Sequence, residues 1–311
     1  MSTVHCLGVL VVDALSGPLA EYPVPGLVSQ VITRSIKFLA GGGAANTSSA
    51  LGQMGIPVTV FSKTGVDING QFLRAELRRN GVDVSQLRET AHESTPFTFV
   101  GIHPTGDRSF IHTPGCNLTF SIQDLDLEAL YNCKALLYQD MWVLPALDGP
   151  SAGEILSRAR QRGVTTLLDE CYGLGPNRAV FESALPHCDV VLPSYDDLHP
   201  IYPQLDPAGV SAHLLNKGAG RVILKLGREG CLVTNSKNSV HLPSVATEIV
   251  DTTGAGDCFD AGFIAGLVNG LDDVAAARVG GVAAAACIRQ VGGAVGIPRY
   301  ELLSESLTAE T

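Results

Sequence analysis

The sequence predicts an α/β fold with a central, mainly parallel sheet and helices on both of its faces. Short apolar runs of strand length alternate along the chain with segments of helical spacing, and most helical segments close on a glycine, a common C-terminal signal. Repeated β-α-β order implies parallel strands joined by helical crossovers. A chain of 311 residues, 45% apolar and 17% charged, is long enough for one large domain of this kind.

Six apolar runs are expected to form buried strands of this sheet. They are residues 4–13, 58–65, 135–140, 165–170, 189–194 and 221–227. Helices are expected between these strands and in the last third of the chain, at 44–55, 70–81, 151–163, 208–220, 257–270 and 272–290.

Two further segments alternate as a one-sided sheet would. Apolar and polar residues alternate over 27–38, and 97–112 reads as two strands around a Pro-Thr-Gly-Asp turn. We expect them to pair as a small β-layer outside the main sheet. This layer would be a lid formed by about 14–38 and 97–113 within a single domain spanning 1–311. The alternative is that both are edge strands of the main sheet.

A small sheet hinged off a domain exposes an apolar face and an unpaired edge, which proteins generally cover. The lid of one subunit could therefore clasp the lid of another, and the sequence favours a homodimer.

Composition argues against several classes of partner. The net charge of −10 disfavours nucleic acid and anionic membranes, and no apolar stretch indicates a membrane span. The apolar start of the chain lacks a basic region and reads as a buried strand instead of a signal peptide. The eight cysteines are dispersed without a C-x-x-C pair, so we expect reduced thiols in a cytoplasmic protein.

The segment 251–263, DTTGAGDCFDAGF, places an acid where a glycine-rich turn becomes a helix. A helix N-terminus binds anions, and Gly254 and Gly256 let the backbone approach a phosphate. Because an anion repels a carboxylate, Asp257 needs a reason to be there. It would be useful as the base that takes a proton from a hydroxyl attacking a phosphate. The alternative is that Asp257 only caps the helix.

A second glycine cluster and an early acid strengthen the catalytic interpretation. Three consecutive glycines, 41–43, precede a helix that carries Asn46, whose amide offers both a donor and an acceptor to a polyol. Asp13 ends the first apolar run, and open α/β sheets bind ligands at such strand ends. Its carboxylate could accept hydrogen bonds from two sugar hydroxyls. The alternatives are helix–sheet packing for the glycines and a turn cap for Asp13.

These residues resemble the ribokinase-like, or phosphofructokinase-B, family of carbohydrate kinases over nearly the whole chain. The resemblance rests on Asp13, on GGGAAN from residue 41, on KLGREG at 225–230 and on DTTGAGDCFDAGF, in the family's order and spacing. It implies a three-layer sandwich with a mainly parallel sheet and a β-sheet lid over the sugar. It also implies ATP-dependent transfer of the γ-phosphate to a primary hydroxyl of a pentose, hexose or related sugar.

The resemblance also implies residue roles. The catalytic base falls on Asp257, and the anion hole falls on Gly254, Ala255 and Gly256. Sugar hydroxyls would be held by Asp13, Gly42, Gly43 and Asn46. The nucleotide loop would contain Lys225, Gly227 and Gly230. Family members use Mg²⁺ with ATP, and many respond to a monovalent cation such as K⁺, for which Asp251 and Thr253 match the contributing positions.

One family motif differs. The usual Asn-x-x-Glu that organises magnesium and phosphate is replaced by LPSYDDL, so Ser194 and Asp197 stand in its places. Aspartate is shorter than glutamate, and we therefore expect Asp197 to engage Mg²⁺ through water.

The acceptor is left open by the residues. Small polar groups favour a free sugar, whereas Phe38, Phe97, Phe99 and Phe110 on the lid keep a nucleoside as the alternative, and Arg34 and Arg108 keep a sugar phosphate open. Asn117 and the run 169–172 are further candidates for substrate contact. A distant alternative is a serine hydrolase, because GPSAG at 149–153 fits G-x-S-x-G around Ser151. That elbow must follow a strand directly, and Ser151 is better interpreted as a helix N-cap.

Overall fold

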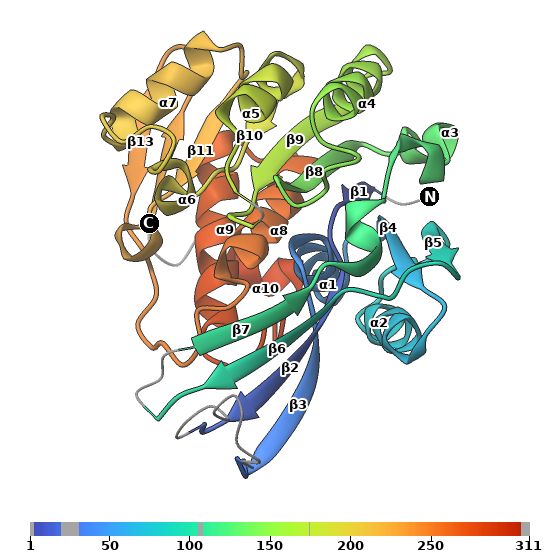
Figure 1. Ribbon diagram of the computed structural model, residues 1–311. Coiled ribbons are helices and arrows are strands. Elements are labelled where there is room, and N and C mark those ends of the chain that lie inside the picture. Colours follow the sequence, from blue (N-terminus) through green and yellow to red (C-terminus); the bar gives the residue numbers. More distant parts are fainter. Residues whose placement is uncertain (1–2, 20–30, 105–107, 174, 306–311) are drawn as a thin grey trace.

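The computed structural model describes residues 3–19, 31–104, 108–173 and 175–305, and it contains the expected central sheet (Figure 1). This sheet has nine strands in the order β13-β12-β11-β10-β9-β8-β1-β4-β5. Seven strands, from β11 to β5, are joined by parallel pairings, and β12 and β13 pair antiparallel at one edge. The strands are β1 (Val4–Leu7), β4 (Val58–Gly65), β5 (Leu87–Thr90), β8 (Ala135–Met141), β9 (Thr165–Glu170), β10 (Val190–Val191), β11 (Val222–Lys225), β12 (Cys231–Thr234) and β13 (Ser239–Leu242).

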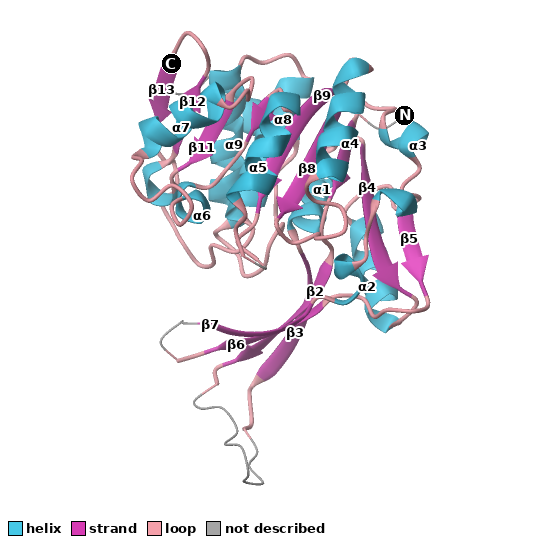
Figure 2. Ribbon diagram, turned by 45° about the horizontal axis from the view of Figure 1, so that its top comes forward, coloured by secondary structure: helices cyan, strands magenta, loops and turns pink. Residues whose placement is uncertain are grey.

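Helices cover both faces of this sheet, as Figures 1 and 2 show. They are α1 (Gly43–Met54), α2 (Ile68–Arg79), α3 (Leu127–Leu130), α4 (Pro150–Gln161), α5 (Arg178–Ala184), α6 (Tyr195–Leu198), α7 (Pro207–Asn216), α8 (Ala255–Val268), α9 (Asp273–Cys287) and α10 (Tyr300–Glu305). Side chains of α1, α8 and α9 pack in one apolar cluster, and those of α4, α5 and α7 pack in another.

The central strands are apolar on both sides because both of their faces are covered. Cys6 belongs to the cluster with α1, whereas its neighbour Leu7 belongs to the cluster with α4. Leu167 and Leu168 divide in the same way. Two apolar layers therefore sandwich the sheet, which gives the three-layer architecture.

A separate four-stranded sheet projects from this body, as Figure 2 shows most clearly. Its strands are β2 (Val11–Gly17), β3 (Ser35–Gly41), β6 (Phe97–Ile102) and β7 (Arg108–Thr113), in the order β3-β2-β6-β7. The pair β2–β6 is parallel, and the two outer pairs are antiparallel. We call these four strands the small sheet.

The first apolar run was expected to be one strand, and this expectation is wrong. Residues 4–13 divide near Gly8 into β1 of the main sheet and β2 of the small sheet. Asp13 therefore lies within a strand of the small sheet and not at the end of a main-sheet strand. Both strands are largely buried, so the apolar run shows no break where the chain changes sheets.

The bounds of the two predicted lid segments also differ from those of the strands. The first strand of the small sheet begins at Val11, and β3 continues to Gly41, beyond the predicted end at 38. Residues 20–30 of the first segment and 105–107 of the predicted turn lie outside the described residues. The two segments join because β2 pairs with both β3 and β6. In the part of the chain that the structure describes, no helix is long and apolar enough to cross a membrane.

Candidate active site

A cavity of about 230 Å³ lies between the small sheet and the main body. The small sheet contributes most of its wall, and the main body contributes Asn46 from α1, Thr253 from the turn before α8, and Gly293. The lining residues on the small sheet are Asp13, Leu15, Leu39, Ala40, Gly41, Thr98, Val100, Arg108 and Phe110. The lining therefore combines apolar side chains with a few polar and charged ones, as in sites that bind small polar molecules.

The glycine-rich turn at 254–256 begins α8 in the way that an anion site requires. Gly254 has φ +73°, a left-handed conformation, and a Cβ there would lie 2.8 Å from the Cα of Gly293. Only glycine combines that backbone conformation with such a close approach. The first turn of α8 contains one acid, Asp257, and the N-cap Gly254 has no side chain to satisfy the free N–H groups.

Asp257 is held by side-chain amides. Asn46 Nδ2 donates to Asp257 Oδ2 at 2.8 Å, and Gln139 Nε2 donates to Asp257 Oδ1 at 3.0 Å. The helix cap is Gly254, three residues earlier, so the capping alternative for Asp257 does not match the geometry. Burial raises the pKa of Asp257 to about 6, opposed by the hydrogen bond from Asn46. A carboxylate with a pKa near neutrality suits a general base.

Gln139 is a site residue that the sequence did not reveal. It lies on β8, is fully buried, and donates from the same nitrogen to Thr47 Oγ1 at 2.8 Å. Thr47 Oγ1 in turn lies 3.1 Å from the carbonyl oxygen of Asp257. Gln139 therefore fixes Asp257 against α1. The only sequence signal was its position near the end of a buried parallel strand, where ligands bind in open α/β sheets.

Asp13 lines the cavity from β2. Burial raises the pKa of its carboxyl to about 6, opposed by a hydrogen bond from Thr98. Gly41 lies on the neighbouring strand β3, and a side chain there would collide with the Asp13 carboxylate. Asp13 is thus placed where it could contact a sugar, as the sequence predicted. Gly41 is the glycine that lines the cavity beside it.

Gly42 and Gly43 are not among the residues that line the cavity. Gly43 N donates to Asp140 Oδ1 at 3.0 Å, and Ala44 N donates to Asp140 Oδ2 at 3.2 Å. Gly42 has φ +89° and lies against the carbonyl of Val9. The sugar role expected for these two glycines is not supported, because they position the start of α1 over a buried carboxylate.

Lys225, which was expected in the nucleotide loop, has its ammonium group among acids. Its Nζ lies 3.0 Å from Asp169 Oδ1 and 3.1 Å from Asp260 Oδ1. These carboxylates, with Glu170, hold the pKa of Lys225 above its usual range against the opposing effect of burial. A Cβ on Gly256 would lie 3.5 Å from the ammonium nitrogen, so Lys225 places its charge beneath the anion turn.

Gly227 and Gly230 form the turn between β11 and β12. Both have positive φ, +55° and +91°. A side chain at Gly230 would collide with the carbonyl of Leu242 on β13, whereas Gly227 has open space around it. Gly230 thus has a structural reason to be glycine, and Gly227 leaves the loop surface accessible.

The replaced magnesium motif lies beside this cluster. Ser194 N donates to Glu170 Oε1 at 3.0 Å, while Glu170 Oε2 is buried without a hydrogen-bond partner. Burial and the charge of Asp169 raise the pKa of Asp197. Among the described residues, no three His, Cys, Asp or Glu side chains converge to hold a metal ion directly. Asp197 is half-buried, so its carboxylate nonetheless fits contact with a cation through water.

Arg108 occupies the position expected for a monovalent cation. Its Nη2 lies 2.6 Å from Asp251 Oδ1, and its Nη1 donates to Thr253 Oγ1. The groups of Asp251 and Thr253 that would contribute to a cation site are therefore engaged by a guanidinium group from the small sheet.

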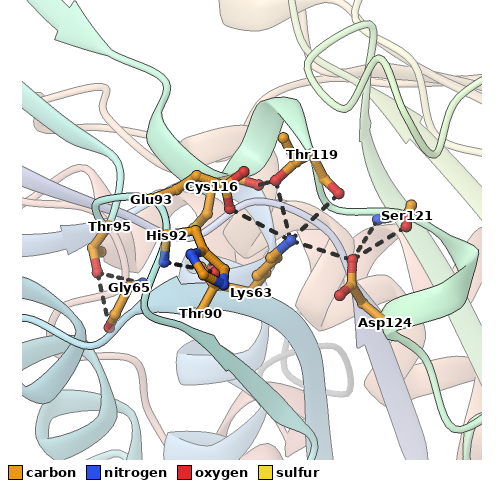
Figure 3. Close-up of polar contacts among 10 residues, drawn as sticks. All are labelled: Lys63, Gly65, Thr90, His92, Glu93, Thr95, Cys116, Thr119, Ser121 and Asp124. Carbon is orange, nitrogen blue, oxygen red and sulfur yellow. Dashed lines mark hydrogen bonds and ion pairs between the residues drawn. The ribbon is translucent and has the colours of Figure 1, made fainter.

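Asn117 is fully buried and does not line the cavity, so its expected substrate contact is not supported. Both polar atoms of its side chain lack a hydrogen-bond partner. Figure 3 shows how the segment around Asn117 contacts β4. Lys63 Nζ donates to Thr119 Oγ1 at 3.1 Å, and Cys116 Sγ lies 3.2 Å from the Lys63 carbonyl. The segment around Asn117 is thus held against the main body.

Ser151 does not occupy a nucleophile elbow. It lies inside α4, whose N-cap is Gly149, so the expected N-cap position was also wrong. The preceding strand β8 ends at Met141, and α4 begins only at Pro150. In a nucleophile elbow the serine follows the strand directly. The hydrolase alternative is therefore abandoned.

Comparisons with known proteins agree with this geometry. The family model described as pfkB family carbohydrate kinase matches residues 9–299. A fructokinase of Rhizobium leguminosarum bv. trifolii is 32% identical over 235 residues, 73% of this chain and 71% of that one. A nucleoside kinase of Methanothermobacter thermautotrophicus is 27% identical over 286 residues, 90% and 87% of the two chains.

The fold is similar to that of a putative ribokinase II from E. coli, solved in complex with ATP and Mg²⁺. The two structures superpose with a TM-score of 0.83 at 22% identity, and each chain is covered to 100%. Since the family model covers nearly the whole chain, the chain belongs to the pfkB family of carbohydrate kinases.

Proposed function

We propose that this protein is an ATP-dependent sugar kinase that transfers the γ-phosphate to a primary hydroxyl, with Asp257 as the general base. The observation that carries the proposal is the carboxylate of Asp257. It is half-buried at the start of α8 and is held by two side-chain amides, and its pKa is raised to about 6. An ionised carboxylate there accepts the proton of the attacking hydroxyl.

The turn before Asp257 would stabilise the transferred group. The backbone N–H groups of Gly254, Ala255 and Gly256 precede or begin α8, where the helix dipole is positive. Charge on the phosphoryl oxygens is best stabilised by donors that are already oriented. Lys225 adds a positive charge beneath Gly256, and the acids around it keep its ammonium group protonated.

The sugar would bind in the cavity under the small sheet. Asp13 on one wall accepts hydrogen bonds from hydroxyls, and Leu15 and Val100 supply an apolar surface. Asn46 lines the same cavity and contacts Asp257, so it links the bound sugar to the base. The small sheet, formed by β2, β3, β6 and β7, would act as a lid that excludes water.

ATP would bring Mg²⁺, which neutralises phosphate charge during transfer. We place the ion beside Asp197, which would contact it through water, with the nucleotide phosphates as the main direct ligands. The nucleotide itself would lie along the loop at Gly227. A contribution of K⁺ through Asp251 and Thr253 has no support in the geometry, because Arg108 engages both residues.

We also propose a homodimer formed through the small sheet. Asp13 and its β3 partner Leu39 line the cavity, so Phe38 and Ile36 project from the opposite face. Both are 54% exposed, and Ile111 on β7 is 61% exposed. An apolar face of this kind is generally covered by a partner.

All eight cysteines lie in the described part of the chain as free thiols, six of them buried. Burial keeps most of their pKa values high, as for Cys6 and Cys188. This pattern suits a reducing compartment, and we propose the cytoplasm.

The direct test is release of ADP from ATP and Mg²⁺ with a panel of free pentoses and hexoses, sugar phosphates and nucleosides. We expect turnover with at least one free sugar. Turnover with nucleosides alone would show that the protein is a nucleoside kinase. Phe110 at the cavity wall would then provide a stacking surface for the base. No turnover with any acceptor would contradict kinase function.

A further inference from the structure

Arg108 is a residue of the small sheet whose side chain ends in the main body. It begins β7, 143 residues before Asp251, yet its guanidinium group reaches the loop that leads into α8. Nη2 lies 2.6 Å from Asp251 Oδ1, and Nη1 donates to the Thr253 hydroxyl. The guanidinium group thus contacts both Asp251 and Thr253, and it joins the small sheet to the turn that begins at Gly254.

The carboxylate that receives this guanidinium group is buried and fully engaged. Asp251 is only 3% exposed. Its Oδ1 also accepts from Thr253 N at 2.9 Å and from Thr253 Oγ1 at 2.7 Å, and its Oδ2 accepts from Gly292 N at 3.1 Å. The Thr253 hydroxyl donates to Asp251 and accepts from Arg108, so both of its hydrogen-bonding roles are used.

Burial of an ionised carboxylate is costly, and a positive partner offsets that cost. In a monovalent-cation site that partner would be an ion coordinated by oxygen atoms of Asp251 and Thr253. Here the same atoms are engaged by a guanidinium group that carries one full positive charge at every physiological pH. Among the described residues, Arg108 is the cation that lies in salt-bridge distance of Asp251.

We propose that Arg108 is a built-in monovalent cation, which takes the place of K⁺ beside the anion turn and makes phosphoryl transfer independent of potassium. Arg108 acts as a positioning residue. It neutralises Asp251 and orders the loop 251–253, which sets the backbone N–H groups of the following turn. The inference rests on the proposed kinase activity, but the effect of K⁺ on the Arg108 variants can be measured without turnover.

The proposal predicts that the rate becomes dependent on K⁺ when Arg108 is removed. Wild-type initial rates should agree within about twofold in KCl, NaCl and tetramethylammonium chloride at one ionic strength. Arg108→Ala frees the oxygen atoms of Asp251 and Thr253 and leaves a buried charge unpaired. Its rate in tetramethylammonium should fall by about tenfold or more, as expected for loss of a charged hydrogen-bonded partner, and KCl should restore most of it.

Two further variants keep the test decisive. Arg108→Lys retains a charge without the bidentate fork and should show a smaller cation response than Arg108→Ala. Lys37→Ala removes an exposed cation from β3 of the same sheet and should behave as wild type. The melting temperature is the readout that does not need activity: KCl should raise it for Arg108→Ala relative to tetramethylammonium, and should leave wild type unchanged.

The alternative role for Arg108 is direct contact with a phosphorylated substrate. In that case Arg108→Ala would raise KM for a sugar phosphate, and neither its rate nor its melting temperature would respond to KCl. That result would overturn the proposal, as would several-fold activation of wild type by KCl. Failure of every acceptor to be phosphorylated would count against the kinase function, while the melting temperatures would still decide the role of Arg108.

Discussion

The Nδ2 atom of Asn46 lies 2.8 Å from the Oδ2 atom of Asp257, across 211 residues of sequence. This bond joins the two glycine-rich segments, because Asn46 follows the turn at 41–43 and Asp257 follows the turn at 254–256. It also connects the cavity to the proposed base, since Asn46 lines the cavity and contacts Asp257. The carboxylate of Asp257 is thus oriented by a residue that lines the cavity.

The rate should depend on pH through the ionisation of Asp257. Because burial raises the pKa of this carboxyl to about 6, log kcat/KM should rise with pH up to about 6 and level above it. Gln139 donates to the ionised form and so lowers the pKa. Gln139→Met should therefore move the acid limb to higher pH by roughly one unit, the worth of one charged hydrogen bond.

The measurement is a pH–rate profile for wild type, Gln139→Met and the control Gln161→Met, which changes an exposed glutamine on α4. An acid limb that stays in place or moves to lower pH in Gln139→Met would contradict the assignment of that limb to Asp257.

Asp13 should control sugar affinity and leave ATP affinity alone. Asp13→Ala removes a carboxylate that lines the cavity, and each charged hydrogen bond lost should weaken sugar binding by about 1.5–3 kcal/mol. Titration calorimetry with the sugar and with a non-hydrolysable ATP analogue separates the two ligands. Unaltered sugar affinity would remove Asp13 from the sugar site.

Asp197 should affect magnesium dependence. Asp197→Glu adds about 1.5 Å of reach, so it should be tolerated and should lower the Mg²⁺ concentration needed for half-maximal rate. Asp197→Ala should raise that concentration without changing sugar affinity. Initial rates against Mg²⁺ at saturating ATP and sugar test this, and superimposable curves for the three proteins would exclude Asp197 from the site.

The small sheet should pair two subunits. Sedimentation at micromolar concentration with sugar present should show a dimer, and Phe38→Lys should weaken it by placing a charge on the outer apolar face. Ile68→Lys is the matched control, because Ile68 is 79% exposed on α2, outside this sheet. A wild-type monomer under these conditions would refute the dimer.

The sequence predicted the main sheet well because its strands are apolar on both faces and are separated by helical periodicity. The predicted strand 58–65 matches β4, and the predicted strand 165–170 matches β9. The strands β5, β12 and β13 were missed, since they are short and lie toward the two edges of the sheet, where few apolar residues are required. The change of sheet near Gly8 was hidden by continuous burial.

Residues of the candidate site could be predicted only where they belong to a local sequence motif. Asp257 and the turn at 254–256 have a local signature, whereas Gln139 and Asp140 are single polar residues at the end of a buried strand. Asp140 has φ +63° and accepts from three backbone N–H groups, those of Val9, Gly43 and Ala44. These contacts join segments more than 90 residues apart, and no local pattern records them.

The central claim is that Asp257 is the general base, and kcat of Asp257→Asn tests it most directly. The substitution keeps the size of the side chain and removes its basicity. With the best acceptor at saturating ATP and Mg²⁺, kcat should fall by roughly 10²–10⁴, while ATP affinity and folding stay close to wild type. The N-cap variant Asp206→Asn, which keeps a good capping residue on α7, should retain full activity. An Asp257→Asn protein with a third of the wild-type kcat would contradict the account.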